Sequence, residues 1–317
     1  MISLRQHIFS LVAVFVALAV GIAAGSTVVR GPLLDSTRAR LESAEQIIEV
    51  ERSENEVLAA ELGQLDGWSD DGPAQLVSGR LADRAVVLIV AGDVDSDVVD
   101  GVVRSLRAAN ATLVGEVRID PAVFDPADAA RVADALGAAA VGVADPAALF
   151  GDTVADLIEQ VSVELSNVGP VSPAEVLSSA FGTLEDAGLV DLLQVQPGDA
   201  VITDLDVVVL TDRNLVADPA RVLSGVVSVS DPDDAGLTVL VGEVGRIAQG
   251  NDSPVPSFVG LIRDSGRLRD EVSTVDNAET VLGWVALVLG LAAADGGSVA
   301  HYGFRDGADR AIPSRPA

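Results

Sequence analysis

The stretch AVVLIVA, residues 85–91, decides the fold class of most of the chain. All seven residues are apolar and four are β-branched, with no alternation between apolar and polar positions. A strand of this composition is typical of a parallel sheet that is covered by helices on both faces. Similar short runs rich in Val, Leu and Ile occur at residues 112–117, 207–210, 237–242 and 271–275.

Segments with helical periodicity separate these runs. In residues 97–109, apolar residues recur at the spacing that places them on one helix face. A second helix is expected over 126–140, because Asp125 followed by Pro126 is a helix start signal. Two more are expected over 152–165 and 173–187. The alternation predicts a doubly wound, mostly parallel, Rossmann-like α/β domain over residues 76–317.

A second long apolar run occupies residues 281–294. It has 14 residues, fewer than the roughly 20 that a membrane-spanning helix needs, so a buried core helix is expected here. Asp276 or Asn277 is expected to cap its amino end.

The chain opens MISLRQHIFSLVAVFVALAVGIAAGS, and residues 8–29 carry no formal charge. As a helix these 22 residues extend roughly 33 Å, enough to cross a bilayer core of about 30 Å. A transmembrane anchor is therefore expected over residues 1–30. The alternative is a cleaved secretory signal, but signal peptides have shorter apolar regions and no single A-x-A site stands out.

Residues 31–67 show a heptad repeat. With Leu34 at position a, seven of ten a and d positions are apolar, which predicts a coiled-coil stalk. Asn55 falls at an a position, where asparagine favours a two-stranded state. A single amphipathic helix packed on the globular domain is the alternative. A polar linker, residues 68–75, follows the stalk.

Gly21 and Gly25 form a G-x-x-x-G pattern inside the expected anchor. Small residues at this spacing let two membrane helices approach closely, although Gly is also common in membrane helices generally. Together with Asn55, the pattern predicts a homodimer or higher homo-oligomer. The short amino-terminal tail is expected to stay in the cytoplasm, which places the α/β domain outside the membrane, in the cell envelope.

Composition excludes several classes of chemistry. The chain has no Cys and no Lys, so disulfides, thiolate metal sites, P-loops and Schiff-base chemistry are not available. A formal charge of −28 disfavours a nucleic-acid partner, because phosphate contacts need basic surface. We expect no cofactor, no metal site and no catalytic residues, and hence a protein that is not an enzyme.

Four polar residues are the candidates for a ligand site. Asp93 follows the first expected strand, and Asp276 and Asn277 follow the last one, at the ends where parallel sheets bind ligands. His301 is the one histidine outside the expected anchor. Helix capping is the alternative role of the three residues at strand ends, and a structural role is the alternative for His301.

The opening segment MISLRQH, the segment STVDNAET (273–280) and the closing HYGF (301–304) occur here in the order seen in the actinobacterial MctB copper transport family. The chain resembles that family over essentially its full length. The resemblance implies a membrane-associated envelope protein implicated in copper efflux and resistance. A channel-forming role in the outer membrane is proposed for mycobacterial members. The resemblance transfers no catalytic residues.

The sequence therefore predicts a membrane-anchored envelope protein in copper homeostasis, with a dimeric stalk, an outer α/β domain and envelope protein partners. Copper itself prefers thiolate, thioether or imidazole ligands, which this chain scarcely offers. Two alternatives remain: an envelope scaffold or binding protein without transport activity, and an anchored hydrolase that uses carboxylates at the strand ends.

Overall fold

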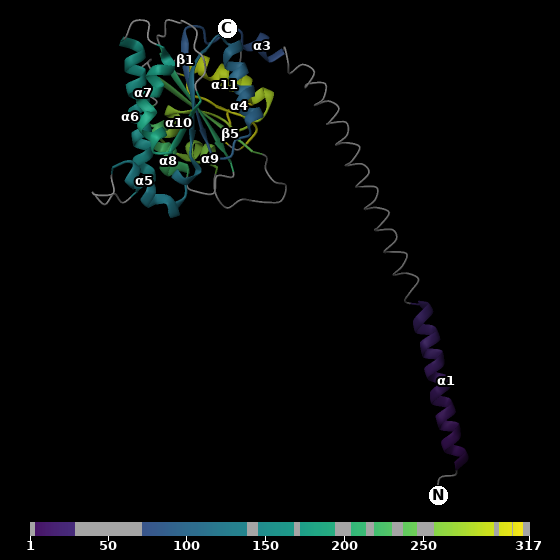
Figure 1. Ribbon diagram of the computed structural model, residues 1–317. Helices are drawn as coiled ribbons and strands as arrows, with labels where there is room; N and C mark the ends of the chain where they lie inside the picture. The colour runs from purple at the N-terminus through teal and green to yellow at the C-terminus, as the bar shows by residue number, and fades with distance from the viewer. Residues whose placement is uncertain are drawn as a thin grey trace. The chain divides into compact units, whose positions relative to one another are not determined.

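The computed structural model (Figure 1) describes residues 4–28, 72–137, 145–167, 172–193, 204–213, 219–229, 237–245, 257–294, 298–305 and 307–312. Within the first of these ranges, side chains are described for residues 7–23. The chain divides into two units, Met1–Gly67 and Trp68–Ala317.

The described part of the first unit is one helix, α1 (Leu4–Val28). Its large apolar side chains are exposed, from Val12 at 52% to Phe9 at 76%. In the part of the chain that the structure describes, no helix combines the length and apolarity needed to cross a membrane. Gly21 and Gly25 lie in α1. The predicted stalk with Asn55, like residues 68–71 of the predicted linker, lies outside the described residues.

The second unit is built on one sheet with the strand order β3-β2-β1-β4-β5-β6-β7. All neighbouring strands are parallel except β3, which pairs antiparallel with β2. The strands are β1 (Arg84–Ala91), β2 (Thr112–Ile119), β3 (Val190–Leu193), β4 (Asp204–Asp212), β5 (Leu237–Val244), β6 (Ser273–Val275) and β7 (His301–Tyr302). The mostly parallel, doubly wound sheet predicted from the apolar runs is confirmed.

The central strand β1 shows why these runs form strands rather than helices. Ala85, Val87 and Ile89 point into one hydrophobic core, and the intervening Val86 and Leu88 point into a second. Because side chains alternate between the two faces of a strand, only a residue series that is apolar throughout satisfies both cores. The sheet is therefore the middle of three layers (Figure 1).

Each face has its own helices. The first core is closed by α5 (Ala129–Ala135), α6 (Pro146–Asn167), α7 (Pro173–Asp186), α8 (Pro219–Val227) and α9 (Phe258–Asp264). The second is closed by α3 (Gly72–Val77), α4 (Ser96–Ala108) and α11 (Val281–Ala294). The predicted core helix over 281–294 is confirmed, since seven of its residues are buried in the second core.

Three local predictions need correction. The expected strand over 271–275 is shorter, because α10 (Leu268–Glu271) precedes it and only residues 273–275 pair. The expected helix over 126–140 is a 3₁₀ turn, Pro126–Asp128, followed by α5. Thr280 rather than Asp276 or Asn277 caps α11, since its hydroxyl accepts a hydrogen bond from the Gly283 amide at 3.0 Å.

Helices α6 and α8 cross at two glycines. A methyl group on Gly151 would overlap the carbonyl oxygen of Val222, and one on Gly225 would lie 2.5 Å from the carbonyl carbon of Gly151. The two backbones are therefore in direct contact. Because this contact leaves no room for a side chain, the first core depends on glycine at both positions.

We expect Gly151→Ala to lower the free energy of unfolding by about 1–3 kcal/mol, because the added methyl must push α6 away from α8. The matched control is Gly182→Ala in α7, where nothing lies within 4 Å of the new methyl. The control should gain about 0.5–1 kcal/mol, the usual helix preference for alanine. Urea unfolding of both variants, monitored by circular dichroism, measures the change in the free energy of unfolding. Equal changes in the two variants would contradict the direct backbone contact between α6 and α8.

Candidate functional site

Three of the four predicted ligand residues lie together at the carboxyl edge of the sheet. Asp276 and Asn277 follow β6, and His301 lies in the adjacent strand β7, paired in register with Thr274. Asp93 is exposed at the end of β1. Strands β4 and β5 lie between β1 and β6, so Asp93 is roughly 14 Å from the other three at the usual strand spacing. Asp93 therefore lies apart from the other three candidates.

Asp93 and its neighbours form a strand-to-helix turn. Asp95 caps α4, because its carboxylate accepts a hydrogen bond from the Asp97 amide at 2.9 Å. This confirms the alternative interpretation of the acidic loop, in which an aspartate begins the helix.

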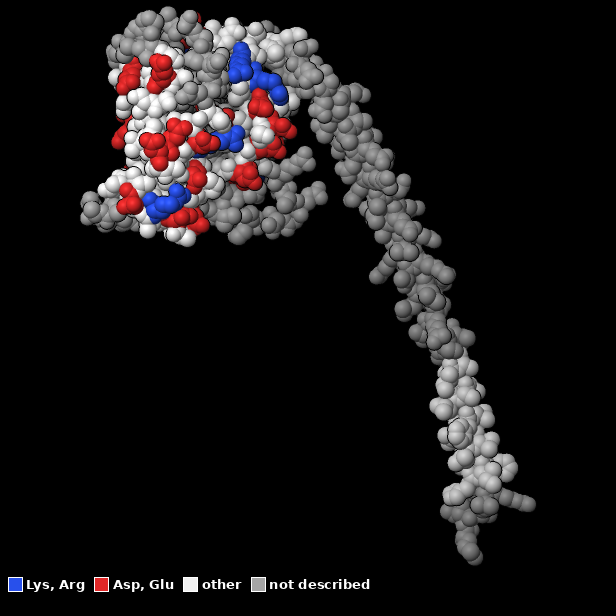
Figure 2. Space-filling model, viewed as in Figure 1, with Lys and Arg blue, Asp and Glu red and all other residues white. Residues whose placement is uncertain are grey.

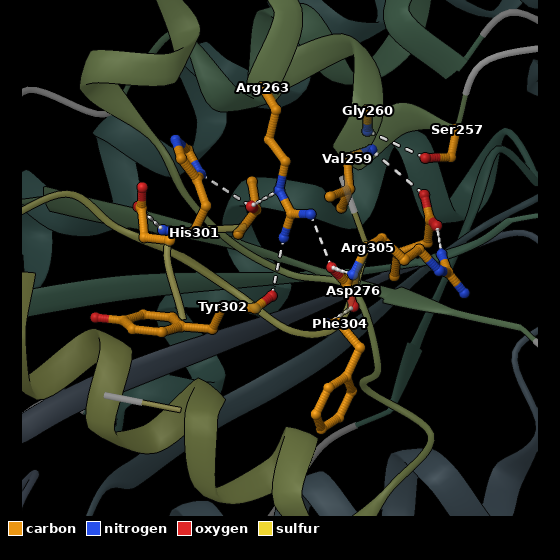
Figure 3. Close-up of polar contacts among 12 residues, drawn as sticks. Ser257, Val259, Gly260, Arg263, Asp276, His301, Tyr302, Phe304 and Arg305 are labelled. Atoms are coloured by element: carbon orange, nitrogen blue, oxygen red, sulfur yellow. Dashed lines mark hydrogen bonds and ion pairs between the residues drawn. The ribbon is translucent and has the colours of Figure 1, made fainter. Parts of the chain in front are cut away.

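The carboxylate of Asp276 is the centre of the network in Figure 3. It pairs with the Arg263 guanidinium of α9 at 2.7 Å, and both side chains are almost fully buried, at 1% and 2% exposure. The backbone amides of Phe304 and Arg305 donate to its two oxygens at 2.9 and 3.1 Å. A charge buried this deeply is stable only when it is paired and hydrogen-bonded.

Gly303 allows the closing turn to wrap around this carboxylate. Its φ of +131° is a conformation that favours glycine, and a Cβ at this position would overlap the Asp276 carboxylate. The glycine of the HYGF segment is therefore required by the aspartate of the STVDNAET segment.

Arg263 also ties β6 and β7 to α9. Its Nε donates to the hydroxyl oxygen of Thr274 at 2.9 Å, and its Nη2 donates to the carbonyl oxygen of Tyr302 at 2.8 Å. Together with the bond to Asp276, one guanidinium thus holds three groups in fixed positions. This residue was not among the sequence candidates.

His301 has both ring nitrogens engaged. Its Nε2 lies 3.1 Å from the carbonyl oxygen of Arg269, which can only accept, so Nε2 carries the proton. Its Nδ1 lies 2.9 Å from the hydroxyl of Thr274 and accepts from it. Burial and the nearby Arg263 charge lower the pKa of His301, whereas the carboxylate of Asp309 raises it.

A second buried carboxylate, Glu243, lies at the end of β5. It pairs closely with Arg305, its second cation Arg213 is 3.8 Å away, and the amide of Val259 donates to it at 3.4 Å. Burial raises the pKa of Glu243, and the hydrogen bond from Ser257 and the two arginines lower it. Since desolvation is the largest effect, Glu243 binds a proton more readily than an exposed glutamate.

Asn277 has a structural role at the start of α11. Its side-chain amide donates to Thr280 at 3.2 Å, while its side-chain oxygen has no hydrogen-bond partner among the described residues. Gly283 lets the helix approach this turn, because a Cβ there would overlap the carbonyl oxygen of Asn277. Trp284 closes the turn by donating to Ala278 at 2.9 Å.

The buried carboxylates and the imidazole of the network are bound within the protein. Each of its two buried carboxylates is paired with arginine, and the imidazole has a donor and an acceptor. Among the described residues no group of three or more His, Cys, Asp or Glu could hold a metal ion. The arrangement therefore fixes the backbone of the carboxyl edge at β5, β6 and β7.

A separate hollow of about 420 Å³ lies at the carboxyl ends of β1 and β2. Its lining includes Gly92, Arg118, Asp120 and Asp191. Arg118 is held by Glu116 at 2.5 Å, so its charge is already paired. None of the four predicted ligand residues lines this hollow.

The comparisons with known proteins cover almost the whole chain. A family model described as "Copper transport outer membrane protein, MctB" matches residues 1–313. The chain belongs to the MctB family. It is 25% identical over 319 residues to the Copper transporter MctB of Mycobacterium tuberculosis (strain CDC 1551 / Oshkosh), covering 97% of this chain and 98% of the relative. It is 26% identical over 327 residues to that of Mycobacterium leprae (strain TN), with the same coverage.

The resemblance to the MctB family seen in the sequence is therefore confirmed. Its two carboxyl-terminal segments, 273–280 and 301–304, contain β6, β7 and the turn around Asp276. In this MctB family member, two of the three segments that carry the resemblance thus contribute residues to the buried network.

We expect Asp276→Asn to lower the free energy of unfolding by about 3–5 kcal/mol, because it leaves the Arg263 charge buried without its partner. The matched control is Arg267→Ala, which removes the largely exposed pair Arg267–Glu271 and should cost less than about 1 kcal/mol. Urea unfolding of the full-length variants measures both values. Comparable losses of stability in the two variants would show that the buried pair stabilises the fold no more than the exposed pair does.

Proposed function

We propose that this chain is a membrane-anchored envelope protein in copper homeostasis whose α/β domain acts through other proteins rather than by coordinating copper. Membership of a family described as copper transport outer membrane proteins supports a copper-transport-related envelope protein. The finer proposal, an anchor, a dimeric stalk and an outer domain without a copper site, rests on the arguments below.

The chemistry of the side chains carries the proposal. Copper in proteins is held by thiolates, thioethers or imidazoles, and this chain has no Cys, one Met at position 1 and two His. His301 is buried with both ring nitrogens hydrogen-bonded, so neither is free for a metal. A copper role would therefore depend on assembly with other chains or with partner proteins.

The anchor is supported by the 22 uncharged residues 8–29 and by the apolar side chains of α1, which are more than half exposed within this chain. Hydrocarbon chains of lipid would cover such side chains favourably. The heptads of residues 31–67 and the Gly21–Gly25 pair support association of two copies through the anchor and stalk.

The alternative of an envelope scaffold without transport activity is favoured by the internally satisfied network, since buried carboxylates that are all paired leave little capacity for a substrate. Figure 2 shows Asp and Glu side chains spread over the visible face of the α/β unit, with fewer Arg side chains among them. This surface and the charge of −28 support protein or cation partners rather than nucleic acid.

A strain that lacks this protein should lose copper tolerance, and the full-length chain should restore it. A chain that lacks residues 1–30, directed to the same compartment by a cleavable signal, should fail to restore it, because the anchor is expected to be needed. Growth at graded copper concentrations is the measurement. Unchanged tolerance of the deletion strain would contradict the copper role, and rescue by the truncated chain would contradict the anchor.

The purified full-length chain should bind no stoichiometric Cu(I) in competition with a chromogenic Cu(I) chelator, because it lacks thiolates and free imidazoles. A variant with an added carboxyl-terminal Cys-x-x-Cys peptide serves as the matched control and should remove copper from the chelator. One copper per chain in the unmodified protein would show that the domain coordinates the metal directly.

A further inference from the structure

The turn after β7 presents an exposed aromatic side chain on a buried support. Phe304 is 69% exposed, yet its backbone amide and that of Arg305 are bound by the buried carboxylate of Asp276. Figure 3 shows the Phe304 ring directed away from that carboxylate. The position of the ring therefore depends on groups that solvent does not reach.

The support is a chain of hydrogen bonds with a fixed direction. Asp276 accepts from Arg263, and Arg263 donates through Nε to the Thr274 hydroxyl oxygen. Thr274 has one hydroxyl proton, which it donates to Nδ1 of His301. His301 in turn donates through Nε2 to the Arg269 carbonyl. Only a neutral imidazole that carries its proton on Nε2 gives every group in this chain of hydrogen bonds a suitable donor or acceptor.

Protonation of Nδ1 would break this order. Two donors, the Arg263 Nε–H and the new Nδ1–H, would then face the Thr274 oxygen, and the Thr274 proton would lose its acceptor. The imidazolium would also stand near the Arg263 guanidinium of α9 and the Arg269 guanidinium of α10. The opposing charges are Asp309, after β7, and Asp276, directly after β6, which is already paired with Arg263.

We propose that His301 is a pH-sensitive latch whose protonation loosens Arg263 and Asp276 and so releases the turn 303–305 that presents Phe304. The neutral domain holds the aromatic ring in one position, and the acidified domain does not. This device goes beyond the proposed function, because it regulates one surface of the α/β domain whether or not the protein acts on copper.

The pKa of His301 gives the direction of the switch. Because burial and Arg263 lower this pKa below its ordinary value of 6.5, the folded state holds the proton less tightly than the unfolded state. The stabilising contribution is therefore complete above that ordinary value. It is lost as the pH falls from there through the lowered pKa of the folded state.

Hydrogen exchange of the Phe304 and Arg305 amides in the full-length chain in detergent tests the proposal. Between about pH 7.5 and about pH 5, with rates corrected for intrinsic exchange, protection of both amides should fall about tenfold or more, as expected when bonds to a charged acceptor are lost. The chain has two His, so His7→Gln leaves one imidazole whose NMR signal reports the His301 titration in the same samples.

Three variants separate the latch from a general effect of acid. His301→Asn places a carbonyl oxygen toward Thr274 and cannot titrate, so protection should persist to about pH 5. Glu243→Gln removes a second buried group, a carboxyl whose pKa is raised, and should leave the transition in place. Asp309→Asn removes the charge that favours the imidazolium and should move the midpoint to lower pH.

Two outcomes would overturn the latch directly. One is constant protection of the two amides while the imidazole titrates, and the other is an imidazole that stays neutral down to about pH 5. The loss of amide protection at low pH would be due to another titrating group if its midpoint were unchanged in Asp309→Asn. The same would follow if the loss disappeared in Glu243→Gln. Since Asp309→Asn keeps an oxygen for the His301 amide, its result holds even if His301→Asn does not fold.

Discussion

The ion pair between Arg263 and Asp276 is the interaction on which the carboxyl edge of the sheet depends. Strands β6 and β7 contain three and two residues, well below the usual five or six, so their ladder alone holds them weakly. The guanidinium of Arg263 joins α9 to both strands, and the carboxylate of Asp276 joins them to the turn at Gly303. The cost of burying two charges is offset because every bond made to them also fixes a backbone segment.

The carboxylates at this edge are bound by the protein's own side chains. In open α/β sheets, ligands bind beyond the carboxyl ends of the strands. Here the carboxylates that follow β5 and β6, Glu243 and Asp276, are occupied by the protein's own arginines. The place where a ligand would bind is filled by Arg305 and the turn it belongs to. A separate hollow lies at the ends of β1 and β2, and its lining includes the paired Arg118.

The long, uniformly apolar segments could be predicted from the sequence, because burial on both faces leaves only one arrangement for them. Residues 85–91 and 281–294 are of this kind, and both lie where expected. β3 and β7 could not be predicted, because four and two residues carry no periodic signal and their pairing is decided by tertiary contacts. For the same reason the strand at 273–275 was expected to be longer than it is.

The site was predictable in part. Asp276 and Asn277 were singled out at the end of a strand, and His301 as the one histidine outside the expected anchor; they lie in or directly after the neighbouring strands β6 and β7, where each makes hydrogen bonds within the protein. Arg263 and Glu243 were missed. Arg263 lies near the end of a seven-residue helix, directly before Asp264, so nothing in the linear sequence separates it from a surface arginine. Glu243 could have been identified from the sequence. It is a charged residue in the mostly apolar strand β5, and a charge buried there needs a partner.

The segments that carry the family resemblance, 273–280 and 301–304, are the segments that the buried network joins. Segments of this kind are constrained by their fit to one another. Asp276 needs Gly303 to leave space for its oxygens, and Thr274 needs His301 to accept its proton. Such reciprocal requirements explain the motifs through folding, without any bound metal. If the protein acts through partners, as proposed, the part of this turn that a partner can reach is the exposed ring of Phe304, and the residues that hold the turn are buried.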